Sequence, residues 1–494
     1  MIGIFDSGTG SYRERLERLR PRTAGALPEV AEAVRKIIED VSRRGDVALR
    51  EHAARLDGVP SDAAAEVPRA DFAKALSIVD PAVVKALKLA RERIEWYHAK
   101  QVSGGYTVRD RFGSRLEMRV EPVDRAGVYI PGGKAAYPST VLMNVIPARV
   151  AGVGEVIATS PGASLESSPV ILAACAIAGV DRLFRFGGAQ AVAALAFGTE
   201  TVPACPVVVG PGNAYVAEAK RQLYGRIGIE SVAGPSEIVV IADSSAGPAE
   251  IAADMLSQAE HDETAAAILL TDSPQLARLV QHEIMRAVEV SPRRNILEQS
   301  VPDRGMIILT GSLAEAVEVA NGIAPEHVEL MVRRPEGLAR HIRNAGAIFL
   351  GRTTPEAMGD YLAGSNHVLP TGGAARFSGP LGVGVFLKRT SVVYTSEKAL
   401  NVLGPSIVAL ARAEGLFEHA RSVEIRLPRT GPKPDSRPPA GPGGKVVQLP
   451  GGRGKKPQLR AVDSPARAGK PAAGKLAKVH LLKPRNKPGG GKRK

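Results

Sequence analysis

The feature that most constrains the fold is an alternation of short strand-like runs with longer helix-like runs between residues 126 and 350. The strand-like runs are apolar and rich in β-branched residues, and the runs between them have helical spacing. This alternation is typical of βαβ units, in which helices connect the parallel strands of one sheet. We expect strands over residues 127–130, 156–159, 183–186, 207–209, 237–242, 266–271, 306–309 and 347–350. The predicted fold class is therefore α/β, with two Rossmann-like parallel-sheet domains.

Helices are expected before and between these strands. Val30, Val34, Ile37 and Val41 form one apolar stripe with the 3.6-residue period of a helix, and Gly45 interrupts it. Further helices are expected over residues 81–100, 167–178, 189–197, 213–224, 248–259 and 274–288. The helical pattern therefore starts well before the first strand of the alternating region.

The excess positive charge is concentrated at the C-terminal end. The chain of 494 residues has 65 Lys and Arg against 51 Asp and Glu. Residues 430–494 hold 17 of the basic residues and two acids, Asp435 and Asp463, which leaves 48 basic and 49 acidic residues before them. This tail has 11 Pro, 12 Gly and no aromatic residue, a composition typical of disorder. A basic pI therefore does not make the whole protein a nucleic-acid binder.

The rest of the composition predicts a soluble protein of the cytoplasm. With 44% apolar and 23% charged residues, the chain suits about three globular domains. No unbroken apolar run reaches the ~18 residues of a membrane span, and no signal sequence starts the chain. Cys175 and Cys205, the only cysteines, lack zinc-finger spacing, and we interpret them as buried core thiols.

Two glycine-containing turns follow expected strands, although no G-x-G-x-x-G motif is present. Residues 210–213 (Gly-Pro-Gly-Asn) link a strand to a helix, where free N–H groups and the helix dipole attract anions. An ordinary strand-to-helix turn has the same pattern, so both interpretations stay open. Residues 131–134 (Pro-Gly-Gly-Lys) are a similar candidate, whose lysine either meets a phosphate or is solvated.

Two polar pairs are candidates for chemistry. Gln258 and His261 are three residues apart at the end of an expected helix and could offer an oxygen and a nitrogen to a metal ion. The alternative is a helix end at which His261 interacts with the helix dipole. Glu326 and His327 follow a turn at Pro325 and form a candidate acid–base pair. Its alternative is a pair of surface residues that open a helix.

Further polar residues lie in the last part of the chain before the tail. The glycine-rich stretches 359–367 and 372–384 are long, and the first contains Asp360 and His367. Such loops in a compact chain are often functional. Glu414 and His419 lie five residues apart near the end of the body and do not share a helix face. A joint role for them needs a loop or a second subunit.

Taken together, six segments resemble the histidinol dehydrogenase family in order and spacing over residues 25–425. They are 127–139 (GVYIPGGKAAYPS), 210–220 (GPGNAYVAEAK), 233–237 (AGPSE), 257–261 (SQAEH), 324–330 (APEHVEL) and 359–367 (GDYLAGSNH). Any one of them is a weak signal, whereas this many in order is a strong one.

The resemblance implies a zinc-containing, NAD-dependent oxidoreductase that converts L-histidinol to L-histidine through an aldehyde, the last steps of histidine biosynthesis. It implies Glu326 and His327 as the catalytic residues. The implied zinc ligands are Gln258, His261, Asp360 and His419. The implied substrate contacts are these four residues together with Ser236, His327 and Glu414. The implied NAD contacts are Tyr129, Gln190 and Asn213. In this family Glu414 and His419 come from the partner subunit, so a homodimer is expected.

The chemistry of these residues suits the implied roles. A set of nitrogen and oxygen ligands from Gln, His and Asp is compatible with zinc and leaves positions for the substrate. Zinc would then position the substrate. His327 would take the alcohol proton as hydride leaves, and Glu326 would help water add to the aldehyde.

The resemblance also implies a division of the chain. The expected parts are an N-terminal segment 1–26, an α/β domain of 27–128 plus 237–380 with most zinc and catalytic residues, an NAD-binding domain 129–236, a dimerisation segment 381–429 and the tail 430–494. The tail departs from the family, and so do residues 1–10, which resemble the opening strand and loop of glutamate racemases with Asp6 at the catalytic position. That likeness ends after ten residues, and neither cysteine lies in a racemase motif. We interpret this start as a fused segment.

Two other functions are compatible with the sequence. A related zinc and NAD dehydrogenase would act on another small alcohol, such as a sulfonated diol. In a different class, the tail would bind nucleic acid or another polyanion. Its basic residues without aromatic ones favour non-specific electrostatic contact over base stacking.

Overall fold

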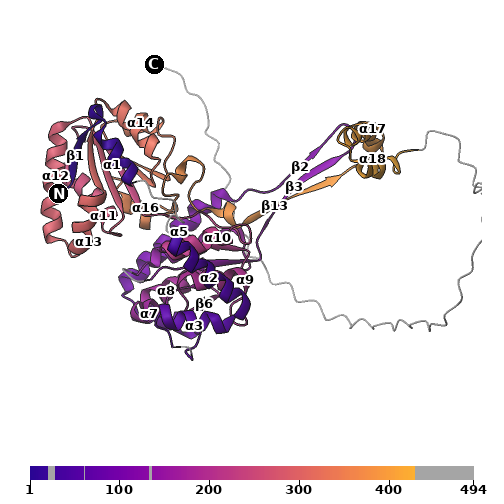
Figure 1. Cartoon of the computed structure of the whole chain (residues 1–494), viewed down its shortest axis with the longest axis horizontal. Coiled ribbons are helices and arrows are strands. Elements are labelled where there is room, and N and C mark those ends of the chain that lie inside the picture. Colours follow the sequence, from indigo (N-terminus) through magenta and orange to yellow (C-terminus); the bar gives the residue numbers. More distant parts are fainter. Residues whose placement is uncertain (20–27, 61, 133–135, 429–494) are drawn as a thin grey trace, which may run out of the picture. The chain divides into compact units, whose positions relative to one another are not determined.

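The structure is a computed structural model that describes residues 1–19, 28–60, 62–132 and 136–428 (Figure 1). The lysine of the 131–134 turn and the basic tail fall outside these residues, and so do the predictions made for them. Within the described residues the named strands form three sheets. Two of them are parallel throughout, which confirms the predicted α/β class.

The larger sheet has six parallel strands in the order β1-β10-β9-β8-β11-β12. The strands are β1 (Gly3–Asp6), β8 (Glu237–Ala242), β9 (Ala266–Thr271), β10 (Gly305–Leu309), β11 (His327–Met331) and β12 (Ala347–Leu350). Apart from β1, this is the order of a doubly wound sheet, whose strand sequence reverses between β8 and β11.

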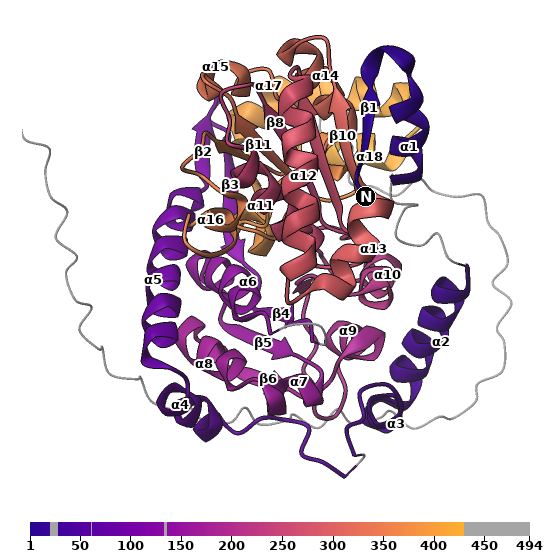
Figure 2. The ribbon, with the colours of Figure 1, turned by 90° about the vertical axis from the view of Figure 1, so that its left-hand side faces the viewer.

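Helices cover both faces of this sheet. One face packs against α11 (Pro248–Ala259), α12 (Pro274–Val290) and α13 (Arg294–Arg304), which lie side by side in Figure 2. The other face packs against α1 (Ser11–Leu19), α14 (Leu313–Ile323) and α15 (Pro335–Ala339). Within β8, Ile238 and Val240 point to the first face and Val239 and Ile241 to the second. Burial on both faces explains why these strands are continuous apolar runs in the sequence.

The smaller parallel sheet has four strands in the order β6-β5-β4-β7. They are β4 (Arg125–Tyr129), β5 (Glu155–Thr159), β6 (Arg182–Phe184) and β7 (Val207–Val209). Its connecting helices are α6 (Pro138–Ala151), α7 (Gly162–Ser167), α8 (Pro169–Ala178), α9 (Gly188–Phe197) and α10 (Ala214–Leu223). Across the sheet the strands are thus the third, second, first and fourth in chain order, so the direction of the strand order reverses between β4 and β7.

Four helices that precede this sheet complete its layers. They are α2 (Pro28–Arg44), α3 (Asp46–Leu56), α4 (Arg69–Ile78) and α5 (Pro81–His98). Helices α2 and α3 pack with α9 and α10, and α4 and α5 pack with α8 and α6. We expected residues 27–128 to belong with 237–380, and Arg93 in α5 does donate to the carbonyl oxygen of Ala363 over 3.3 Å, but these helices also pack on the four-stranded sheet. Their apolar stripes are needed to cover the four-stranded sheet.

The first residues also differ from the expected separate segment. The predicted strand and turn are present as β1 and a 3-10 turn, Ser7–Thr9, with Asp6 Oδ1 accepting from the N–H of Gly8 over 2.8 Å. Strand β1 pairs in parallel with β10. Ile2 and Tyr12 are buried in the cores of the two sheet faces. The fused start is therefore built into the six-stranded sheet as its edge.

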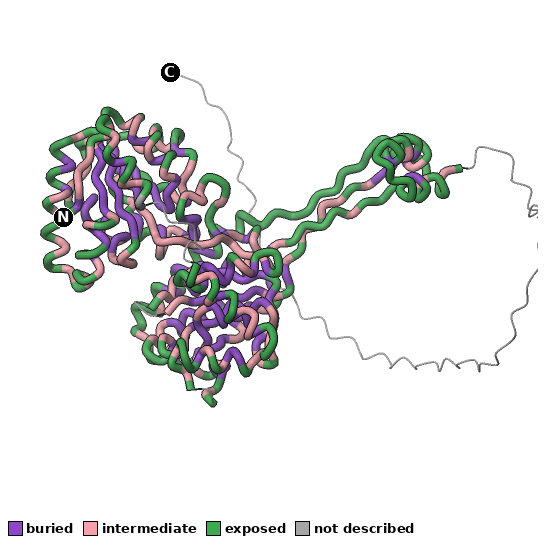
Figure 3. Tube along the Cα trace, viewed as in Figure 1, coloured by how far each residue is buried: buried purple, intermediate pink, exposed green. Residues whose placement is uncertain are grey.

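The third sheet is antiparallel, in the order β13-β3-β2. Its strands are β2 (Tyr106–Arg109), β3 (Arg115–Pro122) and β13 (Leu387–Tyr394), and the helices α17 (Glu397–Ala413) and α18 (Phe417–Glu424) follow β13. Figure 3 shows that its strands are largely exposed, unlike those of the parallel sheets. The expected segment 381–429 is thus tied to β3 by strand pairing.

The predictions about the cysteines and membrane spans can also be compared with the described chain. Cys175 and Cys205 are buried and unpaired, and burial raises the pKa of both thiols, that of Cys205 to about 12. This confirms their interpretation as core thiols. Among the described helices, none has both the length and the apolar character that crossing a bilayer requires.

Candidate active site

Glu326 and His327 lie at the amino end of β11, beside the start of β8. Nδ1 of His327 lies 3.1 Å from the main-chain oxygen of Glu237. Because a carbonyl oxygen only accepts, Nδ1 carries the proton and Nε2 is left as the basic nitrogen. The N–H of Glu237 donates to Oε2 of Glu326 over 3.1 Å. The two residues therefore begin a buried strand, and the alternative of a surface helix start is wrong.

The strained residue Ala324 sets the direction of the chain before Glu326 and His327. Ala324 ends α14 with φ 55°, the only positive φ of a non-glycine residue in the described chain. Left-handed backbone costs a residue with a Cβ about 1 kcal/mol. Directly after it, Pro325 and Glu326 accept hydrogen bonds from Gly346 and Ala347 of β12 over 3.1 and 2.9 Å. The turn at Ala324 thus brings Glu326 into the sheet at once.

Burial sets the protonation of the pair. Burial, reinforced by the negative charges of Glu237, Asp360 and Glu356, raises the pKa of Glu326 well above its usual range. Burial lowers the pKa of His327 to about 4. Both shifts have the same physical cause, because a low-dielectric site disfavours the charged form of either group. At neutral pH the imidazole is uncharged and can accept a proton at Nε2.

Two carboxylates from α16 (Glu356–Tyr361) face His327. Oε1 of Glu356 lies 3.6 Å from Nε2 of His327, and Ser257 Oγ donates to its other oxygen over 3.1 Å. Asp360, one helical turn later, lies 3.5 Å from Nδ1 of His367. The sequence motifs indicate Asp360 but not Glu356. The signal was the spacing of four residues, which puts both carboxylates on one helix face.

The predicted metal ligands of the body lie in the same region. Gln258 is buried near the end of α11, and its Oε1 has no hydrogen-bond partner among the described residues. His261 follows the helix end, and its charge acts on both Asp360 and His327. An amide oxygen, an imidazole and a carboxylate are a donor set that zinc accepts. The residues present therefore fit the metal that the resemblance implies.

A second set of potential ligands overlaps with the first. Ligand atoms of His327, Glu356 and Asp360 lie within 4.8 Å of one another. This group shares Asp360 with the predicted set. Ser236 lies at the start of β8, where its carbonyl accepts from the N–H of Ala266.

Glu414 and His419 lie elsewhere. Glu414 caps the end of α17 and His419 lies in α18, and both are exposed. In the part of the chain that the structure describes, no hydrogen bond or ion pair links either residue to the group around His327. One chain alone does not bring them to the site.

The predicted cofactor residues gather at the carboxyl edge of the four-stranded sheet. Tyr129 ends β4, and its hydroxyl accepts from the N–H of Gly188 over 3.1 Å. Gln190 donates to Asp57 over 3.1 Å. Asn213 Oδ1 accepts from the first N–H groups of α10, as an N-cap. Asp57, directly after α3, thus also lies at this edge, where it accepts from the N–H of Gly187 over 2.8 Å.

This edge offers free polar atoms to a dinucleotide. Oε1 of Gln190 and Oγ of Ser160 are buried, and neither has a hydrogen-bond partner within the described ranges. The turn 210–213 connects β7 to α10 at the reversal point of the sheet. Crevices at such points are the usual nucleotide sites of doubly wound sheets. The residues present fit an NAD molecule.

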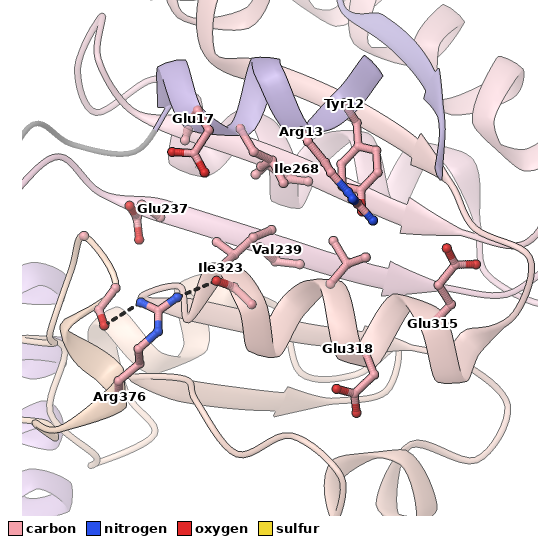
Figure 4. Close-up of a pocket in the computed structure, with 16 residues that line it drawn as sticks. Tyr12, Arg13, Glu17, Glu237, Val239, Ile268, Glu315, Glu318, Ile323 and Arg376 are labelled. Carbon is pink, nitrogen blue, oxygen red and sulfur yellow. Dashed lines mark hydrogen bonds between the residues drawn. The ribbon is translucent and has the colours of Figure 1, made fainter. Parts of the chain in front are cut away.

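A cavity of about 840 Å³ lies beside this site and does not contain it. Figure 4 shows it between α1 and α14, with Ile268 on its floor and Arg13 and Glu318 on its walls. It reaches Glu237, whose pKa burial raises to about 7. The cavity lies over one face of the six-stranded sheet. The polar groups that could perform chemistry lie instead at the amino ends of its strands.

Two doubly wound parallel sheets, one followed by a glycine-containing turn at a helix start and one that carries a buried acid–imidazole pair, define an α/β protein of the enzyme class. The family model described as Histidinol dehydrogenase matches residues 20–427. The chain belongs to the histidinol dehydrogenase family.

Individual relatives agree with this assignment. The chain is 48% identical to the histidinol dehydrogenase of Pseudomonas syringae pv. tomato over 86% of its own length and 96% of the relative. It is 50% identical to that of Rhodopseudomonas palustris, over 86% and 98%. The crystal structure of histidinol dehydrogenase from Elizabethkingia anophelis superimposes with a TM-score of 0.75 at 33% identity, covering 80% of this chain and 91% of that one.

Proposed function

We propose that this protein oxidises L-histidinol to L-histidine with NAD, in two hydride transfers through the aldehyde. The observation that carries the proposal is the neutral imidazole of His327, whose basic Nε2 faces buried carboxylates beside the predicted metal ligands. A dehydrogenase needs such a base to remove the alcohol proton as hydride leaves the carbon. Membership of the family supplies the substrate.

The roles of the side chains follow from their environments. His327 accepts the alcohol proton at Nε2, and the nearby carboxylate of Asp360 stabilises the cation that forms. Glu326, whose pKa is raised by burial, is a stronger base than an exposed glutamate. It takes a proton from the water that adds to the aldehyde, which yields the ionised hydrate that gives up hydride in the second oxidation.

Gln258, His261 and Asp360 would hold zinc, with His419 of the partner subunit as the fourth ligand. Zinc bound there would supply a Lewis acid that positions the substrate. We prefer this set to the group of His327, Glu356 and Asp360, because ligation would occupy the nitrogen of His327 that must take the proton. Tyr129, Gln190 and Asn213 would contact NAD at the edge of the four-stranded sheet.

A homodimer would complete the site. Apolar side chains are exposed on the part of the chain that carries Glu414 and His419, including Leu410 at 66% and Phe417 at 69%. Exposed apolar patches of this kind mark interaction surfaces. A second copy would cover these side chains and bring its Glu414 and His419 to the substrate. The cytoplasmic location stays a prediction.

The test is reduction of NAD by the purified protein with L-histidinol, before and after metal chelation. Activity that the chelator removes and zinc restores is expected. A panel that includes a sulfonated diol separates the related dehydrogenase, and a chain ending at residue 429 separates any polyanion binding from catalysis. Activity that chelation leaves intact would contradict the zinc site, and no reaction with histidinol would contradict the function.

The metal ligands can be tested by themselves. We expect His261→Asn to lose its zinc in metal analysis, because the shorter amide cannot replace the imidazole nitrogen. His341→Asn, an exposed histidine, is the matched control and should keep its zinc. Stoichiometric zinc in His261→Asn would remove this residue from the ligand set.

A further inference from the structure

A buried ion pair lies beneath the turn 210–213. Nζ of Lys220, in α10, lies 2.6 Å from Oε1 of Glu230, and the two side chains are only 2% and 4% exposed. Moving both charges out of water costs several kcal/mol, so such a pair is a poor way to stabilise a fold. Its placement therefore calls for another reason.

Both members of the pair hold the main chain of Gly210. Lys220 Nζ donates to the carbonyl oxygen of Gly210 over 3.1 Å. The N–H of Gly210 donates to Oε1 of Glu230 over 2.9 Å. One residue of the turn thus has its donor and its acceptor fixed by two opposite charges, through hydrogen bonds that are stronger than neutral ones.

Gly210 is also the residue where the turn presses against the neighbouring strand. Its φ is 115°, and a Cβ there would lie 2.1 Å from the carbonyl oxygen of Tyr129. Strands β4 and β7 are neighbours at the reversal point of the sheet. The ion pair therefore fixes the distance between the ends of these two strands, which is the crevice where a doubly wound sheet binds a nucleotide.

Lys220 does not act as a direct phosphate ligand. Its side chain is buried, and its ammonium group is already bonded to Glu230 and Gly210. A comparison within the same sheet supports a local purpose. Arg125 and Glu155 form a pair of equal length, 2.6 Å, at the amino edge, with side chains 34% and 30% exposed. The buried pair lies at the edge where we place the cofactor.

We propose that Lys220 and Glu230 are positioning residues for the dinucleotide, which hold the turn 210–213 in the shape that receives it. This inference rests on the proposed NAD site. Without the pair, Gly210 would lose two hydrogen bonds, and the turn would have to be ordered again each time the cofactor binds. The pair should therefore affect cofactor affinity more than the chemical step.

The test is equilibrium binding of NADH, followed by its fluorescence or by calorimetry, without histidinol. We expect Lys220→Met to raise the Kd by about tenfold or more, the effect of one lost hydrogen bond to a charged group. The double variant K220M/E230M should show the same loss without leaving a lone buried charge, so it keeps the test valid if the single variant does not fold. Arg125→Met is the matched control.

Steady-state kinetics adds a second measurement. The KM for NAD should rise in both Lys220 variants, while the KM for histidinol at saturating NAD changes less than about twofold. Folded variants that bind NADH within twofold of the parent would overturn the inference and reduce the pair to a structural role. If the parent protein binds no NADH at all, the proposed function fails and the inference fails with it, which is a different result.

Discussion

The two parallel sheets share a doubly wound strand order, but the residues that we propose as functional lie at opposite edges of the two sheets. In the four-stranded sheet, Tyr129 and the turn 210–213 follow the carboxyl ends of β4 and β7. In the six-stranded sheet, Glu237, Glu326 and His327 stand at the amino ends of β8 and β11. In both sheets these strands flank the reversal point. The usual rule for strand order thus agrees with the proposed cofactor site and disagrees with the position of the buried acid–imidazole pair.

The reason lies in what fills the carboxyl edge of the six-stranded sheet. There Asp243, directly after β8, accepts from the N–H of Arg333 over 3.0 Å and from that of Ser245 over 2.9 Å. The first of these bonds ties the loop after β8 to the segment that follows β11. The candidate catalytic groups lie at the other edge, where α11 and α16 carry the candidate metal ligands Gln258 and Asp360. A doubly wound fold therefore has possible sites at both edges of its sheet, and the side chains at each edge determine which of them can carry out chemistry.

The largest expected effect tests this division of labour. His327→Asn removes the proposed base at the amino edge, and we expect kcat to fall by about 10²- to 10⁴-fold, the contribution of a general base. The Kd for NADH should stay within twofold, because the carboxyl edge of the other sheet is unchanged. Stopped-flow or steady-state NADH formation and NADH binding measure the two quantities. Loss of both together would mean that the edges are not separate sites.

Glu326→Gln should separate the two oxidations. Because Glu326 is assigned to the water that adds to the aldehyde, we expect oxidation of histidinaldehyde to slow by about 10²-fold and alcohol oxidation to slow less. Each substrate is supplied separately, and NADH formation is recorded. The variant keeps the size and the hydrogen-bonding oxygen of the side chain. Equal losses in the two reactions would exclude this role.

A third expected effect concerns stability and buried charge. Glu329, also in β11, is fully buried, and burial followed by the charge of Asp254 raises its pKa from 4.5 to about 9. Its stabilising contribution is complete below pH 4.5 and is lost as the pH rises toward 9. We expect Glu329→Gln to be more stable than the parent at pH 9, by on the order of 1–3 kcal/mol, with little difference at pH 5.

The four-stranded sheet supplies the control for that effect. Glu218, in α10, is equally buried but pairs with Arg221 over 2.7 Å, and this hydrogen bond lowers its pKa. Its stabilising contribution is present above pH 4.5 and is lost on acidification. Glu218→Gln should therefore lower the melting temperature at neutral pH. A Glu329→Gln variant that is also less stable at pH 9 would show that the carboxylate is compensated.

The strands of the parallel sheets could be predicted because strands that are buried on both faces consist of continuous apolar runs, which are visible in the sequence. Strand 347–350 was predicted with the observed bounds, and 237–242 and 266–271 likewise. The antiparallel sheet could not be predicted in this way. Strands β2 and β13 are mostly exposed, so their sequences have no apolar pattern, and β13 pairs with a strand more than 200 residues earlier. Pairings at that distance leave no local signal.

The site was predictable in its residue types and not in its contacts. Glu326, His327 and Asp360 were recognisable from their motifs, and the structure brings them together. The bond from His327 to the carbonyl of Glu237, by contrast, depends on β8 and β11 being neighbours. Strand order is a property of the whole sheet, so no window of sequence contains it. The partner contribution of His419 stays a prediction for the same reason.

The smallest expected effect is that of replacing Ala324. Its turn is also the last difference between the two edges. The turn at the other edge uses Gly210 for its positive φ, whereas this one forces a buried alanine to φ 55°. We expect Ala324→Gly to change stability by no more than about 1 kcal/mol, because relief of strain and the extra freedom of glycine nearly cancel.

The activity of that variant is the informative measurement. If the fixed turn holds Glu326 and His327 in place, a more flexible residue should lower kcat by a few-fold while NADH binding is unchanged. Ala320→Gly, one turn earlier in the right-handed part of α14, is the control, and it should lose about 1 kcal/mol of stability without that loss of kcat. An unchanged kcat in Ala324→Gly would mean that the strand pairing of Glu326 with β12 suffices to position the catalytic pair.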